Sequence, residues 1–223
     1  MKLVDTLAEQ ARLEELLDAS KPPMPPECAG LHYLLGTPFR YGAPYPRGSR
    51  FRRAGLTAGV FYASKAITTA VAETSFHRLL FFADSPGTPW PDNAGEFTAF
   101  SVRYRTPAGL DLASPPLHRD RAIWTHPTDY AHCQALADAA RAADVELLRY
   151  PSARDAAEGS TNLALLTCRA FASREPDARQ TWRIHLGAGG VRAICTFPDA
   201  RVEFGREAFA EDTRIRALQW ERP

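Results

Sequence analysis

The sequence predicts an α+β domain in which mixed, largely antiparallel sheets carry flanking helices. Three observations support this class: segments with strand character outnumber helical segments, short turns join several of the strands, and no internal repeat is present. The chain has 223 residues, of which 45% are hydrophobic, so it is long enough to enclose a sizeable core.

The N-terminal segment is expected to lie outside that domain. Leucines recur at roughly helical spacing in residues 2–19, which predicts an amphipathic helix. Residues 21–27 contain four prolines, which cannot continue a helix. We therefore place a helix and proline-rich linker at 1–27 and the main domain at 28–223. We expect the helix to pack on its own domain, with self-association or contact with a partner protein as alternatives.

Two helices are expected in the main domain. Ser64 is suited to cap the first, at residues 65–82, whose apolar residues share one face. Thr128 or Asp129 is suited to cap the second, at residues 130–143.

Strands are expected where apolar residues alternate or cluster between turn residues. The expected strands are residues 60–63, 96–105, 110–112, 145–150, 162–167, 180–186 and 191–196. The GAGG sequence at 187–190 precedes a strand-like segment, whereas a dinucleotide-binding glycine loop opens a helix, so we interpret it as a hairpin turn.

The overall charge is nearly balanced, with 27 basic and 26 acidic residues and a net charge of +1. This balance predicts no general attraction to nucleic acid or to a membrane surface. One local exception is a short arginine-rich segment without acidic residues, and its arginines are Arg40, Arg47, Arg50, Arg52 and Arg53. A solvated loop, a nucleic-acid contact and a pocket for a polyanionic small molecule all remain open. Gly48, Ser49 and the neighbouring aromatic residues favour the pocket.

The cysteine pattern indicates a reducing environment. Cys28, Cys133, Cys168 and Cys195 are widely separated and form no C-x-x-C pair, so we expect buried free thiols in the cytosol. No stretch resembles a signal peptide or a membrane span, and a cytoplasmic location is expected.

Two familiar kinds of site are not indicated. Glu73 and His77 stand four apart on a predicted helix, but two ligands do not make a metal site, so we expect no metal and an exposed pair. Ser152 lacks the G-x-S-x-G turn of a serine hydrolase.

Four segments, in order, resemble the signature blocks of the RES domain: GSRF at 48–51, FYAS at 61–64, TAVAE at 69–73 and RYPSARD at 149–155. The NLALLTCRAF segment at 162–171 is similar to the block that follows them. The family is named for an arginine, a glutamate and a serine, and Arg50, Glu73 and Ser152 stand at the matching positions. The resemblance runs from about His32 to Phe209, with Ala153 in place of a common valine and a variable loop at 156–160.

This resemblance implies an ADP-ribosyltransferase-like fold and a bacterial toxin neutralised by an Xre-type antitoxin protein. The toxin would cleave the nicotinamide–ribose bond of NAD and deplete NAD by hydrolysis or phosphorolysis. NAD is then a consumed substrate, inorganic phosphate is a co-substrate if the reaction is phosphorolysis, and no cofactor is permanently bound. The alternatives are a protein ADP-ribosyltransferase and a non-enzymatic module that binds a partner or nucleic acid.

Cleavage of that bond requires negative charge near the ribose and a firm hold on the pyrophosphate. Glu73 suits the first need, while Arg50, together with Arg40, suits the second. Tyr62 is expected to stack on nicotinamide, and Tyr41 is a weaker candidate for the same cleft.

Polar groups complete the expected site. Ser152 is expected to orient the ribose or Glu73 rather than to act as a nucleophile. Asn162 is expected to support the site with its amide, with a turn or strand-end role as the alternative. Arg47, Arg52 and Arg53 would accommodate free phosphate, which mildly favours phosphorolysis.

Overall fold

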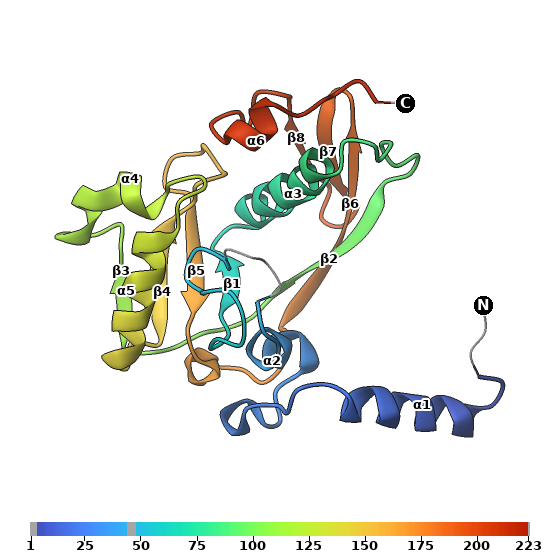
Figure 1. Cartoon of the computed structure of the whole chain (residues 1–223), viewed down its shortest axis with the longest axis vertical. Coiled ribbons are helices and arrows are strands. Elements are labelled where there is room, and N and C mark those ends of the chain that lie inside the picture. The colour runs from blue at the N-terminus through green and yellow to red at the C-terminus, as the bar shows by residue number, and fades with distance from the viewer. Residues whose placement is uncertain (1–3, 44–47, 223) are drawn as a thin grey trace.

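The chain folds into two four-stranded sheets with helices packed against them (Figure 1). The computed structural model describes residues 4–43 and 48–222. One sheet is mixed and the other is antiparallel, so the predicted α+β class is confirmed.

The first sheet brings together the strands that lead into the predicted site. Its order is β1 (Phe61–Ser64), β5 (Thr161–Leu165), β4 (Leu147–Pro151) and β3 (Gly109–Asp111). Both β1 and β4 run antiparallel to β5, so their C-terminal ends lie beside the start of β5. Residues that follow β1 and β4 therefore emerge at one edge of this sheet.

The helix α5 (Ala131–Ala142) packs on the first sheet, where Cys133, Ala137 and Ala140 join its buried core. Two short elements, η2 (Leu117–Asp120) and α4 (Arg121–Trp124), precede this helix. Trp124 completes the core beside α5.

The second sheet is antiparallel in the order β2 (Gly95–Ser101), β6 (Ala178–Gly187), β7 (Gly190–Cys195) and β8 (Ala200–Phe204). The long helix α3 (Ile67–Asp84) follows β1 but buries its apolar face in the core of this second sheet. The short helix α6 (Thr213–Arg216) covers the same core. The helix α3 therefore connects the two halves of the molecule.

The predicted hairpin at the GAGG sequence is confirmed. Ala188 and Gly189 form the loop between β6 and β7. Gly190 has a φ of +114°, and a Cβ at this position would lie 2.2 Å from the backbone oxygen of Phe204. Only glycine fits this turn without moving β8.

The prediction of the cap on α3 is wrong. The helix begins two residues later than expected, its cap residue is Ala66, and no side chain bonds to the cap position. The Ser64 hydroxyl instead donates to Asn162 on the neighbouring strand. On α5, the cap residue is Tyr130, and Asp129 accepts from the backbone N–H of Ala131.

Besides η2, α4 and α6, four short elements of the described residues escape the sequence patterns. They are η1 (Pro26–Cys28), α2 (Tyr33–Arg40), η3 (Cys168–Ala170) and the edge strand β8. The helix α2 contains Gly36 and Pro38, two residues that ordinarily argue against a helix.

The N-terminal helix forms but does not pack as expected. Thr6 and Glu9 make a capping box at the start of α1 (Leu7–Ala19). No residue of α1 is buried, and Leu7, Leu16 and Leu17 are 90%, 54% and 52% exposed. Figure 1 shows α1 extending away from both sheets. No helix in the described residues is both long and apolar enough to span a bilayer.

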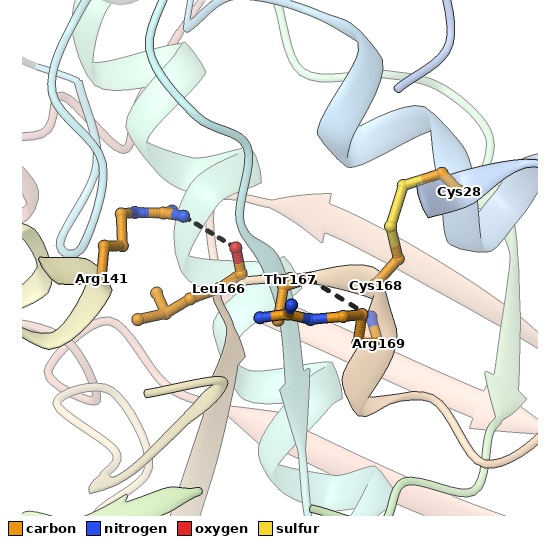
Figure 2. Close-up of a disulfide and its surroundings, with 6 residues drawn as sticks. All are labelled: Cys28, Arg141, Leu166, Thr167, Cys168 and Arg169. Carbon is orange, nitrogen blue, oxygen red and sulfur yellow. Dashed lines mark hydrogen bonds between the residues drawn. A yellow bond between two sulfur atoms is a disulfide. The ribbon is translucent and has the colours of Figure 1, made fainter. Parts of the chain in front are cut away.

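A disulfide joins two of the four cysteines, so the expectation of four free thiols is wrong. Cys28 in η1 bonds to Cys168 in η3, 140 positions later in the sequence (Figure 2). Cys133 and Cys195 are buried free thiols, as expected. The bridge ties the proline-rich linker to the end of β5, and only the folded chain brings its partners together.

We expect Cys28→Ser to lower the free energy of unfolding by about 2–5 kcal/mol, because the bridge closes a long loop in the unfolded chain. Thermal unfolding with and without reductant measures this effect. Reductant should lower the melting temperature of the wild type to that of the variant and leave the variant unchanged. Equal melting temperatures in oxidised protein would contradict a stabilising bridge.

Candidate active site

The carboxylate of Glu73 is held between the two sheets. Glu73 lies on α3 and is half-buried. Its Oε1 accepts hydrogen bonds from the Ser152 hydroxyl at 2.8 Å and from the Asn162 amide at 2.5 Å. Within the described residues, Oε2 receives no hydrogen bond. One oxygen of the carboxylate therefore fixes its position, and the other is left for a ligand.

Ser152 follows the last residue of β4 and is buried. Its Oγ accepts from the backbone N–H groups of Arg154 at 3.1 Å and Asp155 at 3.0 Å. The hydroxyl hydrogen is therefore directed to Glu73. This arrangement suits an orienting group, because the hydroxyl donates to the same carboxylate oxygen that the Asn162 amide binds.

Asn162 is oriented from its other side. The hydroxyl of Ser64 donates to Oδ1 of Asn162 at 2.6 Å, and the two residues are register partners across β1 and β5. With Oδ1 accepting from Ser64, the Nδ2 group faces Glu73. The FYAS and NLALL segments therefore meet at this bond.

A tight turn before β1 holds Arg50. Ser49 and Arg52 exchange backbone hydrogen bonds of 2.7 and 3.2 Å across it. Gly48 enters the turn with a φ of +68°, where a Cβ would lie 2.1 Å from the Arg52 carbonyl oxygen. The Tyr62 hydroxyl accepts from the backbone N–H of Phe51 at 2.9 Å and lies 2.9 Å from the Ser49 hydroxyl.

The Arg50 side chain is only 9% exposed. Its Nη1 donates to the carbonyl oxygens of Trp124 at 2.6 Å and His126 at 3.0 Å. The guanidinium lies over the Tyr130 ring, 4.8 Å from the ring centroid. Arg50 therefore fixes the segment before α5 and places positive charge behind Tyr130.

The hydroxyl and the aromatic ring of Tyr62 have different surroundings. Burial raises the pKa of its hydroxyl, which therefore stays protonated at neutral pH while it binds the Arg50 turn. The residue as a whole is 38% exposed. The aromatic face is thus the part that remains available to a ligand.

The structure places the side chains of Arg40 and Arg52 in contacts away from Glu73. Arg40 binds the N-terminal segment, with Nη1 at 2.9 Å from Asp18 and Nε at 2.5 Å from the carbonyl oxygen of Pro22. Arg52 donates to the backbone carbonyls of Tyr41 and Thr57. Tyr41 contributes its backbone oxygen, which accepts the hydrogen bond from Arg52, and within the described residues the structure gives its side chain no hydrogen bond.

The two remaining arginines of this segment differ. Arg53 pairs with Asp138 at 2.8 Å on the surface of α5. Arg47 lies outside the described residues.

A cavity of about 500 Å³ lies beside the Arg50 turn. Its lining residues are Arg53, Ala54, Thr128, Asp129, Tyr130, Ala131 and Gln134. Tyr130 links the cavity to Arg50, because it lines the cavity and its ring packs on the Arg50 guanidinium. This cavity has the size of a small-molecule site and a positive side chain at its wall.

Sequence reasoning missed a buried ionic cluster next to Glu73. The Arg154 side chain lies 3.6 Å from the Phe76 ring centroid and 3.3 Å from Asp212. Asp212 also accepts two bonds from the guanidinium of Arg214, at 3.0 and 2.7 Å. Arg154 belongs to the RYPSARD segment, but Asp212 follows it by 58 positions, so spacing gave no signal for the pair.

Within the described residues, no group of three histidine, cysteine or acidic side chains is placed to hold a metal ion. Glu73 and His77 share a face of α3, but Glu73 is bound to Ser152 and Asn162 rather than exposed.

The RES domain family model matches residues 24–187, well over half of the chain. The chain belongs to the RES-domain family. Arg50, Glu73 and Ser152 all lie within the matched region, and a search of curated proteins finds no significant match. RES domains are associated with NAD-utilising toxins of toxin–antitoxin systems.

We expect Asp212→Asn to destabilise the fold by about 3–5 kcal/mol, because it leaves Arg154 buried without its counter-charge. The control is Glu203→Gln, which removes the exposed Arg201 pair and should cost less than about 1 kcal/mol. Chemical denaturation measures both values. A loss no larger than that of the control would contradict the role of the buried pair.

Proposed function

We propose that this RES domain cleaves the bond between nicotinamide and ribose in NAD. The observation that carries the proposal is the Glu73 carboxylate, fixed through Oε1 by Ser152 and Asn162 with Oε2 left for a ligand. A carboxylate preorganised in this way stabilises positive charge as it develops nearby, without having to reorient during the reaction.

The departure of nicotinamide leaves an oxocarbenium-like ribose. In the proposed complex, Oε2 of Glu73 accepts a hydrogen bond from the 2'-hydroxyl of that ribose. Its negative charge then lies beside the cationic ring in the transition state. Ser152 and Asn162 hold the carboxylate and take no part in bond formation.

The surroundings of Arg50 suit the rest of the dinucleotide. The cavity at Tyr130 has room for a large part of such a ligand. Arg53 lines it and Arg50 lies behind the Tyr130 ring, so both would place positive charge near the pyrophosphate. The exposed ring of Tyr62 offers a face on which nicotinamide can stack. Arg40 is excluded from this proposal because its contacts are with Asp18 and Pro22.

Membership of the RES-domain family supports a biological role. We propose that the chain is the toxin of a toxin–antitoxin pair, that it lowers cellular NAD, and that an Xre-type antitoxin neutralises it. Water, inorganic phosphate or a protein side chain can accept the ADP-ribose, and product analysis separates these three reactions.

We expect Glu73→Gln to keep the fold and NAD binding but to reduce nicotinamide release by at least about 100-fold, because the amide carries no charge. Chromatography of NAD incubated with purified protein measures the release. Glu207→Gln, a change on the exposed surface, is the control and should behave as wild type. Full activity of Glu73→Gln, or intact NAD with the wild type, would contradict the proposal.

We expect Arg50→Ala to raise the KM for NAD by about 10-fold or more, because it removes charge and loosens the segment that carries Tyr130. The kcat should change less than the KM. Thermal unfolding separates loss of the fold from loss of affinity. An unchanged KM in a folded Arg50→Ala protein would remove Arg50 from the binding site.

A further inference from the structure

His77 is a titratable group beside Glu73 that the proposed function leaves unused. It follows Glu73 by four residues on α3, which places the two Cβ atoms about 5–6 Å apart on one helix face. The imidazole is exposed, and its edge packs on Phe76 with ring centroids 5.2 Å apart. His77 therefore lies beside Glu73 on the helix surface, with part of its ring shielded from water and part in contact with solvent.

Charged groups from four segments act on His77. They are Glu73 of α3, Arg154 of the loop after β4, Arg214 of α6 and Arg50 of the turn before β1. Partial removal of the ring from water is the largest effect, and with the three arginines it outweighs the attraction of Glu73 and lowers the pKa of His77. Asp212 offsets only part of the arginine charge. The imidazole is therefore neutral at pH 7 and able to accept a proton.

The other titratable side chains that interact with Glu73 cannot serve as a base at neutral pH. Burial raises the pKa of Tyr150 well above its ordinary value, so its hydroxyl is protonated. Arg154 keeps its proton in its ion pair with Asp212. Glu73 itself is committed through Oε1 to Ser152 and Asn162 and, in the proposed complex, through Oε2 to the ribose.

We propose that His77 accepts a proton from the water molecule that attacks C1' of the nicotinamide ribose, so that the site performs hydrolysis. This inference rests on the proposed function. The bond between C1' and nicotinamide breaks, and its electron pair leaves with nicotinamide, whose ring loses its positive charge. The water oxygen bonds to C1', and one water proton passes to His77 and then to solvent.

A base beside the position from which the acceptor attacks C1' would assist water but not phosphate. Water must lose a proton when it forms the new bond, whereas the phosphate dianion attacks through an oxygen that is already ionised. His77 therefore favours hydrolysis, in contrast to the mild preference for phosphorolysis that the arginine-rich segment suggests from sequence.

The first test is the pH dependence of kcat for the wild type and for His77→Gln, which keeps a polar side chain but does not titrate. Wild-type kcat should fall as the pH drops through the pKa of His77, which lies below the ordinary histidine value of about 6.5, because the protonated ring cannot accept a proton. In the variant, kcat should fall at least about 100-fold and lose this acid limb, while KM stays nearly unchanged. Free imidazole should restore part of the activity of His77→Ala.

The matched control is His185→Gln. His185 lies on β6 with its side chain on the face away from the Trp182, Ile184 and Leu186 core that α3 covers. This variant should keep both kcat and the acid limb. Mass spectrometry of the products in millimolar inorganic phosphate should show ADP-ribose rather than its 1-phosphate ester.

Two results would overturn this inference alone. The first is a His77→Gln variant whose kcat and acid limb equal those of the wild type. The second is the phosphate ester as the main product. Absence of nicotinamide release from the wild type would overturn the proposed function as well. An NMR titration is independent of activity, because Glu73→Gln should lower the pKa of His77 further by removing the neighbouring negative charge. An unmoved histidine pKa would place His77 outside the reach of Glu73 and also overturn the inference.

Discussion

The two hydrogen bonds that converge on Oε1 of Glu73 determine the arrangement of this site. Glu73 belongs to a helix whose apolar face is buried against the second sheet, whereas its donors come from the first sheet, where Asn162 lies on β5 and Ser152 directly follows β4. The carboxylate can hold its position only while the two sheets keep their relative placement. The geometry of the proposed active site and the joining of the two halves therefore depend on the same polar contacts.

The ionic cluster around Arg154 strengthens this junction. Its guanidinium packs on Phe76 of α3, pairs with Asp212 before α6, and donates at 2.5 Å to the carbonyl oxygen of Pro127. Arg50 binds the carbonyl oxygens of Trp124 and His126 in the same segment. Two arginines thus hold the chain before α5 from two directions. Buried charges are costly unless they are paired, and here the pairing of Arg154 with Asp212 joins the loop after β4 to the segment before α6.

Local patterns predicted most of the strands and both long helices, because alternation and helical spacing record which face of an element is buried. The positions of Arg50, Glu73 and Ser152 came from the family resemblance. The predictions that were wrong concern contacts between residues far apart in the sequence. The Cys28–Cys168 disulfide, for example, depends on the contact of η1 with η3. The position of Arg40 depends in the same way on a bond to Asp18, a residue of the N-terminal helix. Ser64 was expected to cap a helix, but the neighbouring strand offered Asn162 as a better partner.

The region matched by the family model ends at Gly187, yet the support of Glu73 extends beyond it. The face of α3 opposite Glu73 and His77 packs on a core that contains Val191, Ala193 and Cys195 of β7 and Ile215 of α6, and β8 packs Val202 and Phe204 against it. Asp212, which neutralises Arg154, also lies in this later region. The motif residues thus place the reacting groups, while the C-terminal strands and α6 hold the helix that carries them. Variation after residue 187 can therefore change the position of the carboxylate without altering any motif residue.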